Sequence, residues 1–436
     1  MTVIGAPAVA AAVAAAVGGN RLIRTSRLDS GLQVVTEAMP DSHSVTLGFW
    51  VDAGSRDETP VEAGASHFLE HLLFKGTDTR SAKDIAESIE AVGGDMNAFT
   101  TKEYTAYYTR LLDEDVELGL DILCDIMDSP AFRGEEVDAE RQVILEEINM
   151  NDDEPSDLVH EVFHQTVFPD HPLGREVLGE RSTITAMTPE QIRSYFNTRY
   201  RPPKMVLAAA GNVDHDLVVS GIDRRFGGRP GDAPARVVPG LAPARRLGVV
   251  KRSTEQAHII VGMRSIDRDD DDRYALAVLN QIVGGGMSSR LFQEIREKRG
   301  LVYSVYSYRA AYLETGAFAI YAGTGPERAG QVIDLIDLEL DKLLADGITD
   351  RELTVAKGHL KGSLALSLED SAGRMNRIGR SQLLHGEVVP FSELVARTEA
   401  VGHDDVRRVI DRVLGNERVL AVVGPFSESD FADRVA

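Results

Sequence analysis

The sequence predicts an α+β protein built from two related halves. A short apolar strand pattern at residues 45–49 returns at residues 259–263, and the glycines inside the two copies lie 262 − 48 = 214 positions apart. An amphipathic helix that leads into an apolar strand ending in glycine also occurs twice, and those glycines, Gly211 and Gly424, lie 424 − 211 = 213 positions apart. Nearly equal offsets at both ends of a unit indicate an internal duplication of roughly 215 residues.

Within each half, strand patterns are mixed with long amphipathic helices. Apolar residues recur at helical spacing over residues 82–92, 115–127, 136–150 and 330–344. Strands are expected at residues 45–49, 104–111, 205–211, 259–263, 316–322 and 419–424. The strand patterns suit antiparallel sheets, which together with the helices give the α+β class.

The domain boundaries follow from composition. Residues 226–246 are rich in Gly, Pro and Ala and show neither the helical nor the strand periodicity of apolar residues. They are therefore expected to link a first domain, 25–225, to a second, 247–436. Residues 1–24 are expected to form a flexible Ala-rich arm or a short docking helix. No Lys or Arg precedes the apolar stretch 6–17 of this arm, which argues against a secretory signal or transit peptide and favours a cytoplasmic protein.

Composition excludes several classes of function. No run of about 18 apolar residues is present, so no membrane insertion is expected. The net charge of −22 argues against a nucleic-acid partner and favours basic ligands. Cys124 is the single cysteine, which excludes intrachain disulfides and multi-thiolate metal sites, and its apolar neighbourhood predicts a buried structural thiol.

The motif His67-x-x-Glu70-His71 points most directly to chemistry. Residues four apart share one face of a helix, so both imidazoles can bind one zinc ion while Glu70 takes a proton from a water molecule. This order is the inverted form of the more common His-Glu-x-x-His motif. The rest of the helix is apolar, and polar groups on a buried helix need a partner that offsets their desolvation. These apolar neighbours are Ala65, Phe68, Leu69, Leu72, Leu73 and Phe74.

A second pair of histidines competes with this motif, because His160-Glu161-x-x-His164 has the regular order. Glu176 and Glu180 could in principle supply its third ligand. However, its polar residues share one helical face opposite an apolar one, which is typical of a solvated helix surface. These polar residues are Asp157, His160, Glu161 and His164. We therefore rank the inverted motif first.

A third zinc ligand is expected from the acidic helix 136–150. Glu140, Glu146 and Glu147 are the candidates. Glu140 and Glu147 are seven residues apart, two turns along one face, so one can bind the metal while the other supports it through a hydrogen bond. The residues alone leave the choice open.

The stretch His67-Phe-Leu-Glu-His-Leu-Leu-Phe-Lys-Gly-Thr77 resembles the catalytic helix of the pitrilysin family, and in particular its branch of mitochondrial processing peptidases and bacterial processing-peptidase-like proteases. The resemblance spans nearly the whole chain after about residue 25 and implies two α/β-roll domains of the processing-peptidase type. It also implies a third ligand 76 residues after the second histidine, and 147 − 71 = 76 selects Glu147, with Glu140 in the supporting place.

Two further segments resemble the family. Gly93-Gly-Asp-Met-Asn-Ala-Phe-Thr100 is similar to the edge strand beside the catalytic cleft, which implies that an extended peptide binds there. The residues concerned are Asn97, Ala98, Phe99 and Thr100. The segment 291–303 implies that Arg296 and Tyr303 hold the substrate and stabilise the reacting carbonyl. A surface arginine beside a packed tyrosine, with no such role, is the alternative.

These observations predict a zinc-dependent endopeptidase with one Zn²⁺ per chain and Glu70 as general base. An offset of 214 carries the zinc residues onto positions without metal-binding potential, so the second half is expected to assist with the substrate only. Those positions are Gln281, Gly284, Gly285 and Lys361. The resemblance also implies a homodimer. The rival hypothesis is a non-catalytic peptide-binding or scaffold subunit of a processing-peptidase-like complex.

Overall fold

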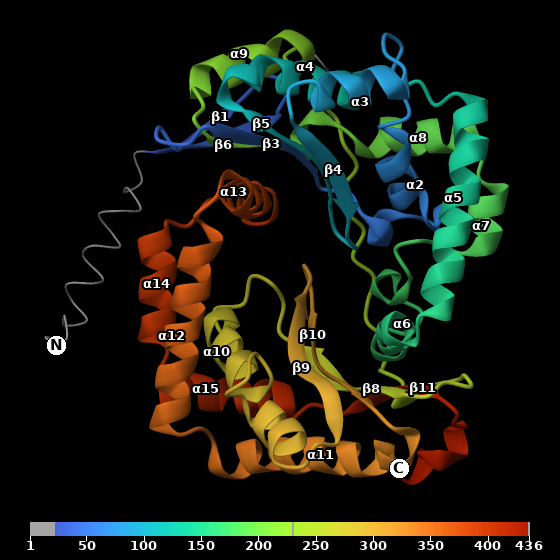
Figure 1. The fold of residues 1–436 in the computed structure, drawn as a ribbon, viewed down its shortest axis with the longest axis vertical. Coiled ribbons are helices and arrows are strands. Elements are labelled where there is room, and N and C mark those ends of the chain that lie inside the picture. The colour runs from blue at the N-terminus through green and yellow to red at the C-terminus, as the bar shows by residue number, and fades with distance from the viewer. Residues whose placement is uncertain (1–21, 229–230, 435–436) are drawn as a thin grey trace, which may run out of the picture. The chain divides into compact units, whose positions relative to one another are not determined.

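The computed structural model describes residues 22–228 and 231–434 and confirms the α+β class. It divides into two compact units (Figure 1). Unit 1 takes its described residues from Met1–Leu145, Val177–Val237 and Ala365–Val395, and unit 2 from Glu146–Glu176, Val238–Leu364 and Ala396–Ala436. The predicted arm lies outside the described residues except at its end, where residues 23 and 24 already belong to a strand.

Unit 1 contains a six-stranded mixed sheet in the order β1-β2-β6-β3-β5-β4. Its strands are β1 (Ile23–Arg27), β2 (Gln33–Ala38), β3 (Ser44–Val51), β4 (Asp95–Thr100), β5 (Thr105–Leu112) and β6 (Met205–Gly211). Strands β2 and β6 run parallel, and the other neighbours are antiparallel. Strand β4 therefore forms one edge of this sheet.

Unit 2 contains a five-stranded sheet in the order β7-β11-β8-β10-β9. Its strands are β7 (Leu247–Lys251), β8 (Ala257–Ser265), β9 (Val302–Ala311), β10 (Gly316–Thr324) and β11 (Val419–Gly424). The order and the directions of these five strands repeat those of strands β2-β6-β3-β5-β4 in unit 1. The register repeats as well: Gln33 pairs with Val206 in unit 1 and Leu247 with Leu420 in unit 2, offsets of 247 − 33 = 214 and 420 − 206 = 214. The two sheets thus match the predicted duplication.

Helices cover both sheets. Unit 1 holds α2 (Ala65–Leu72), α3 (Ala82–Glu90), α4 (Val116–Asp128), α7 (Arg181–Ala186), α8 (Pro189–Arg199), α9 (His215–Phe226) and α13 (Ser371–His385). Unit 2 holds α6 (Pro155–Val167), α10 (Arg273–Val283), α11 (Ala329–Asp346) and α15 (His403–Val409). The division between units falls within α5 (Gly134–Asp153), α12 (Asp350–Ser367) and α14 (Phe391–Ala400). Among the described residues, no helix combines the length and apolar character needed to cross a membrane.

The units are not continuous in sequence, unlike the predicted halves. Helix α13, from the second half, packs on β2, β3 and β6 of unit 1, and its counterpart α6, from the first half, packs on β7, β8 and β11 of unit 2 (Figure 1). Each of these two helices thus covers the sheet formed by the other half of the sequence, an arrangement called here the exchange of helices. Helical periodicity shows which face of a helix is buried, but it does not show which sheet buries it.

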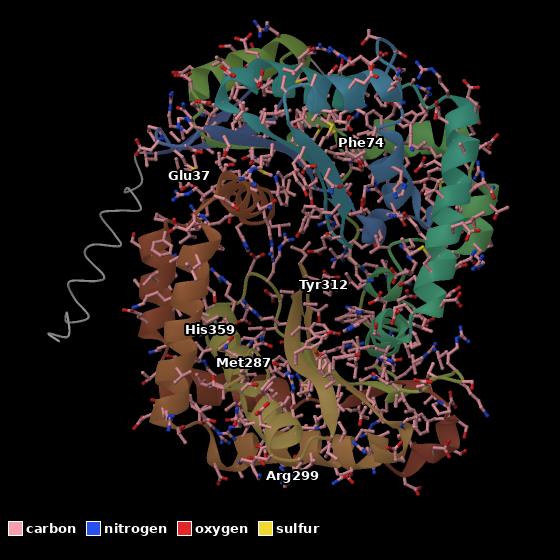
Figure 2. All side chains as sticks on the ribbon, in the orientation of Figure 1. Glu37, Phe74, Met287, Arg299, Tyr312 and His359 are labelled. Atoms are coloured by element: carbon pink, nitrogen blue, oxygen red, sulfur yellow. The ribbon has the colours of Figure 1, made fainter. Side chains whose placement is uncertain are left out.

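Helix α13 fits closely onto the sheet of unit 1. Met375 and Ile378 are buried in one cluster with Trp50 of β3, and a Cβ atom on Gly379 would lie 2.2 Å from the indole Nε1. The buried Glu37 of β2, labelled in Figure 2, pairs with Arg374 and Arg377 at 2.5 and 3.2 Å. Apolar packing and buried ion pairs together hold the exchanged helix.

The cores are apolar, as the sequence predicts. Cys124 of α4 is buried, and burial raises the pKa of its thiol to about 12. The thiol is therefore protonated and unreactive at neutral pH, in agreement with the prediction of a structural cysteine.

Candidate metal centre and active site

Helix α2, which bears the inverted motif, has a well-defined start. Gly64 has φ +93°, and a Cβ atom there would lie 2.5 Å from Ile184 Cδ1, so both conformation and space require glycine. The buried Glu58 carboxylate accepts hydrogen bonds from the backbone N–H groups of Gly64 and Ser66, at 2.8 and 2.7 Å. It thus satisfies backbone donors of the first turn and complements the positive end of the helix dipole.

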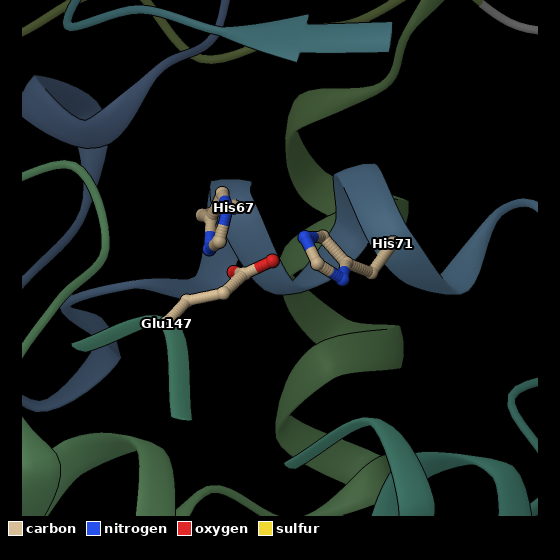
Figure 3. Close-up of side chains that lie close together, drawn as sticks. All are labelled: His67, His71 and Glu147. Atoms are coloured by element: carbon tan, nitrogen blue, oxygen red, sulfur yellow. The ribbon is translucent and has the colours of Figure 1, made fainter. Parts of the chain in front are cut away.

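The three predicted metal ligands come together (Figure 3). One ligand atom from each of His67, His71 and Glu147 lies within 4.8 Å of the others. The two imidazoles share one face of α2, with ring centroids 4.6 Å apart. Among residues 22–228 and 231–434, this is the one group of three or more His, Cys, Asp or Glu side chains arranged to hold a metal ion.

Glu140 fixes the orientation of His71. Its Oε1 lies 2.7 Å from His71 Nδ1, and its Oε2 lies 2.7 Å from Lys75 Nζ. Burial opposes the charge of Glu140, but the hydrogen bonds from His71 and Lys75 outweigh it and lower the pKa of the carboxyl. A charged acceptor at Nδ1 places the proton of the neutral imidazole there, which leaves the Nε2 lone pair to bind a cation.

The same contact positions Glu147. The division between units falls after Leu145, but α5 is one continuous helix from Gly134 to Asp153. Glu140 and Glu147 are two turns apart on one face of it, so the hydrogen bond between Glu140 and His71 also holds Glu147 beside α2. From the residues alone the third ligand was open among three glutamates, and the structure brings Glu147 to the histidines.

The donor set fits zinc. His67 is 8% exposed, and burial, together with the neighbouring His71, lowers its pKa to about 3, so its imidazole is neutral and can donate a lone pair. Two imidazole nitrogens and one carboxylate oxygen are the protein ligands of many catalytic zinc sites.

Glu70 lies on the same helix, adjacent to His71, and is partly buried. Tyr107 lies on β5 and Tyr200 directly follows α8, and both of these elements contact α2. The hydroxyls of the two tyrosines are hydrogen-bonded to each other at 2.9 Å. Burial, and to a lesser extent the charge of Glu70, raises the pKa of both tyrosines. Both tyrosines therefore stay neutral at neutral pH.

The predicted peptide-binding residues 97–100 all lie on β4, the edge strand of unit 1. This strand contacts α2, and Thr100 Oγ1 lies 3.5 Å from the carbonyl oxygen of Ser66. Phe99 packs edge-on against Trp50 with centroids 5.7 Å apart, so its side chain supports the strand. The Asn97 Oδ1 accepts a hydrogen bond from the Ala98 N–H at 2.8 Å.

Arg296 and Tyr303 of unit 2 also come together. Arg296 lies in the π-helix Phe292–Glu297, and its guanidinium carbon is 4.7 Å from the centroid of the Phe292 ring and 5.2 Å from that of Tyr303. Tyr303 lies on β9 and is 81% exposed. The alternative of a packed tyrosine is therefore wrong, because the arginine stacks on an exposed tyrosine. The predicted role of both residues in holding the substrate stays a prediction.

The prediction that His160 and His164 lie on a solvated surface is wrong. Both are partly buried against tyrosines of unit 2: His160 Nδ1 is 2.8 Å from the Tyr308 hydroxyl, and His164 Nε2 is 3.2 Å from the Tyr312 hydroxyl. His160 also stacks on the Tyr321 ring. The partners lie about 150 positions further along the chain, beyond the reach of a helical pattern. Ranking this pair below the inverted motif agrees with the structure, since it forms part of no metal-binding group among the described residues.

Sequence reasoning missed two residues that support the metal centre. Lys75 lies three residues beyond the end of α2, and its place four residues after His71 is the only signal in the sequence for its contact with Glu140. Glu58 reaches the start of α2 through a loop, for which the sequence offers no periodic signal.

The chain matches known families and proteins over most of its length. Residues 33–181 match the family described as Insulinase (Peptidase family M16), and residues 186–360 match the family described as Peptidase M16 inactive domain. An uncharacterized zinc protease of Streptomyces coelicolor is 48% identical over 94% of this chain and 91% of its own length. Another, of Mycobacterium tuberculosis, is 44% identical over 92% and 93%, respectively. An uncharacterized zinc protease of Bacillus subtilis is 38% identical over 93% and 98%.

Solved structures share the fold. The crystal structure of a protease from Helicobacter pylori has a TM-score of 0.86 at 23% identity and covers 92% of this chain and 99% of its own. A structure from Pseudomonas fluorescens, described as a peptidase M16 inactive domain, has a TM-score of 0.86 at 22% identity, covering 93% and 98%. These matches confirm the resemblance to the pitrilysin, or insulinase, family. The chain belongs to peptidase family M16 and is a metalloendopeptidase.

Proposed function

We propose that this protein is a zinc-dependent endopeptidase that cleaves extended peptides, with one Zn²⁺ per chain bound by His67, His71 and Glu147. The observation that supports it most is the approach of three ligand atoms to within 4.8 Å of one another, on two helices that Glu140 joins. The names of the bacterial relatives, zinc proteases, support the choice of metal.

When bound, the zinc ion would polarise the peptide carbonyl and make the attacking water more acidic. Glu70 would take the proton from this water and later deliver it to the leaving amine nitrogen. Glu140 would keep His71 in the required orientation and tautomer throughout, because it accepts a hydrogen bond from Nδ1.

The substrate would bind as an added strand at β4. An edge strand offers backbone groups to an extended peptide, and β4 contacts the metal helix within unit 1. Asn97 to Thr100 would supply these backbone groups, so the protein would recognise the main chain of the peptide more than its side chains. For Arg296 and Tyr303 we keep the role that the resemblance implies, as donors to the substrate, because their stacking orders an exposed phenol. The homodimer and the cytoplasmic location stay predictions.

Metal analysis combined with peptide cleavage tests the proposal. Purified wild-type protein should contain one zinc per chain and cleave internal bonds of unstructured peptides, as mapped by mass spectrometry. Glu147→Gln should lose zinc and activity together. Glu146→Gln is a matched control, because Glu146 is exposed on the adjacent position of the same helix.

The scaffold hypothesis predicts a different result. A non-catalytic subunit would bind peptides equally well with and without zinc and would leave them intact. That outcome with wild-type protein, zinc content having been measured, would contradict the proposed activity.

A further inference from the structure

We infer that Arg236, which lies in the stretch of chain after α9 and before β7, is a positioning residue for both the metal helix and the candidate peptide-binding strand. This inference rests on the proposed function. Residues 231–245 form no helix or strand, yet the Arg236 side chain is only 6% exposed and lies inside unit 1. A buried guanidinium in an irregular segment requires charged partners.

Those partners are carboxylates from three separate places in unit 1. The guanidinium donates to both oxygens of Asp57, from Nε to Oδ1 and from Nη2 to Oδ2, each at 2.8 Å. Its Nη2 also lies 2.9 Å from Asp52 Oδ1, just after β3, and 2.5 Å from the carbonyl oxygen of Glu103. Its Nη1 lies 4.0 Å from the Glu103 carboxylate. Although burial opposes it, the bonds to Asp57 raise the pKa of Arg236, so the guanidinium stays charged.

Asp57 connects Arg236 to the metal helix. Asp57 lies in the short helix Ser55–Asp57, and the next residue is Glu58, whose carboxylate receives the N–H groups of Gly64 and Ser66. Ser66 directly precedes the ligand His67. A shift of Asp57 would therefore displace the carboxylate at the start of α2, and with it the first of the two histidines.

Glu103 connects Arg236 to the edge strand. It lies in the turn that joins β4 to β5, and the same turn binds the segment before α2 through two backbone hydrogen bonds. These run from the Ser55 N–H to the Thr101 carbonyl oxygen, 3.2 Å, and from the Arg56 N–H to the Lys102 carbonyl oxygen, 2.9 Å. A Cβ atom on Gly54 would lie 2.3 Å from that Thr101 oxygen, so the two segments are in direct contact. Arg236 is thus positioned to align the strand and the helix with each other.

Zinc release and steady-state kinetics test this inference. Residues that orient metal ligands typically change metal affinity about 10–100-fold when replaced. Arg236→Gln should therefore release zinc to a chromophoric chelator about 10-fold faster than wild type and lose a similar factor in kcat. Arg236→Lys keeps the charge but cannot form two parallel hydrogen bonds to Asp57, so its zinc release and kcat should stay close to those of Arg236→Gln. Arg245→Gln should match wild type, because Arg245 is exposed and 4.0 Å from an exposed Asp170.

The connection through Asp57 can be tested by itself, because Asp57 accepts both parallel hydrogen bonds from Arg236. Asp57→Asn should speed zinc release and lower kcat, and it should change KM less than Arg236→Gln does. Amide hydrogen exchange should rise in α2 and in the β4–β5 turn of Arg236→Gln, but not in the sheet of unit 2.

Three results are decisive. A folded Arg236→Gln protein with wild-type zinc release, kcat and KM would overturn the inference, while active wild-type protein would leave the proposed function standing. If Arg236→Gln does not fold, Arg236→Lys and Asp57→Asn decide by the same measurements. Wild-type protein without zinc or cleavage would instead refute the proposed function itself.

Discussion

His71 and Glu140 are joined by a 2.7 Å hydrogen bond between Nδ1 and Oε1, and this bond connects the two helices that supply the metal ligands. Glu140→Gln should keep the shape of the side chain but remove the charge that fixes the imidazole tautomer. We expect zinc affinity to fall about 10–100-fold, measured by competition with a chelator of known affinity. Glu135→Gln, an exposed change in the first turn of the same helix, should leave affinity unchanged. Equal affinity in both variants would contradict the role of Glu140.

Glu70→Gln should retain zinc and lose catalysis. A general base typically contributes about 10²–10⁴-fold, so kcat should fall by that factor while the metal content stays at one per chain. Glu161→Gln, in the second histidine motif, serves as the control and should cleave peptides at the wild-type rate. A large loss of activity in Glu161→Gln with none in Glu70→Gln would reverse our ranking of the two motifs.

Tyr303→Phe tests the assisting role assigned to unit 2. The ring, and with it the stacking of Arg296, should persist, because only the hydroxyl is removed. If the phenol donates to the reacting carbonyl, kcat should fall about 10²-fold or more with little change in KM. Tyr306→Phe, on the same strand, should have a small effect. Unchanged kcat in Tyr303→Phe would show that the hydroxyl of Tyr303 has no role in the reaction.

Gly379→Ala should destabilise unit 1, because the new Cβ atom would lie 2.2 Å from Trp50 Nε1. Overpacking of this kind costs about 1–3 kcal/mol, which urea denaturation followed by tryptophan fluorescence would measure, since Trp50 is the single tryptophan. Gly358→Ala on α12 meets no atom within 4 Å and should be neutral or slightly stabilising. Similar midpoints for the two variants would show that α13 does not press on Trp50.

Features that depend on local spacing could be predicted from the sequence. Residues 205–211 and 419–424 form β6 and β11 with the predicted bounds, and the histidines four apart share one helical face. The choice of Glu147 as third ligand depended on the resemblance to the family, because helical spacing alone left three acidic candidates on α5.

Features that depend on distant partners could not be predicted. The tyrosines that bury His160 and His164 come from another part of the chain, and so do the carboxylates around Arg236. The exchange of α6 and α13 was missed for the same reason, since either helix could cover either sheet on pattern alone. The periodicity of apolar residues shows which face of a helix is buried, but only the tertiary structure shows which surface covers that face.

The exchange of helices has a consequence for how the protein is made. The sheet beside the metal helix is complete only when α13, residues Ser371–His385, has left the ribosome, close to the end of the 436-residue chain. A nascent or prematurely terminated polypeptide that already contains every zinc ligand still lacks the cover for Trp50 and its neighbours. Completion of the sheet that supports the metal helix therefore depends on a segment that the ribosome makes after all three proposed zinc ligands.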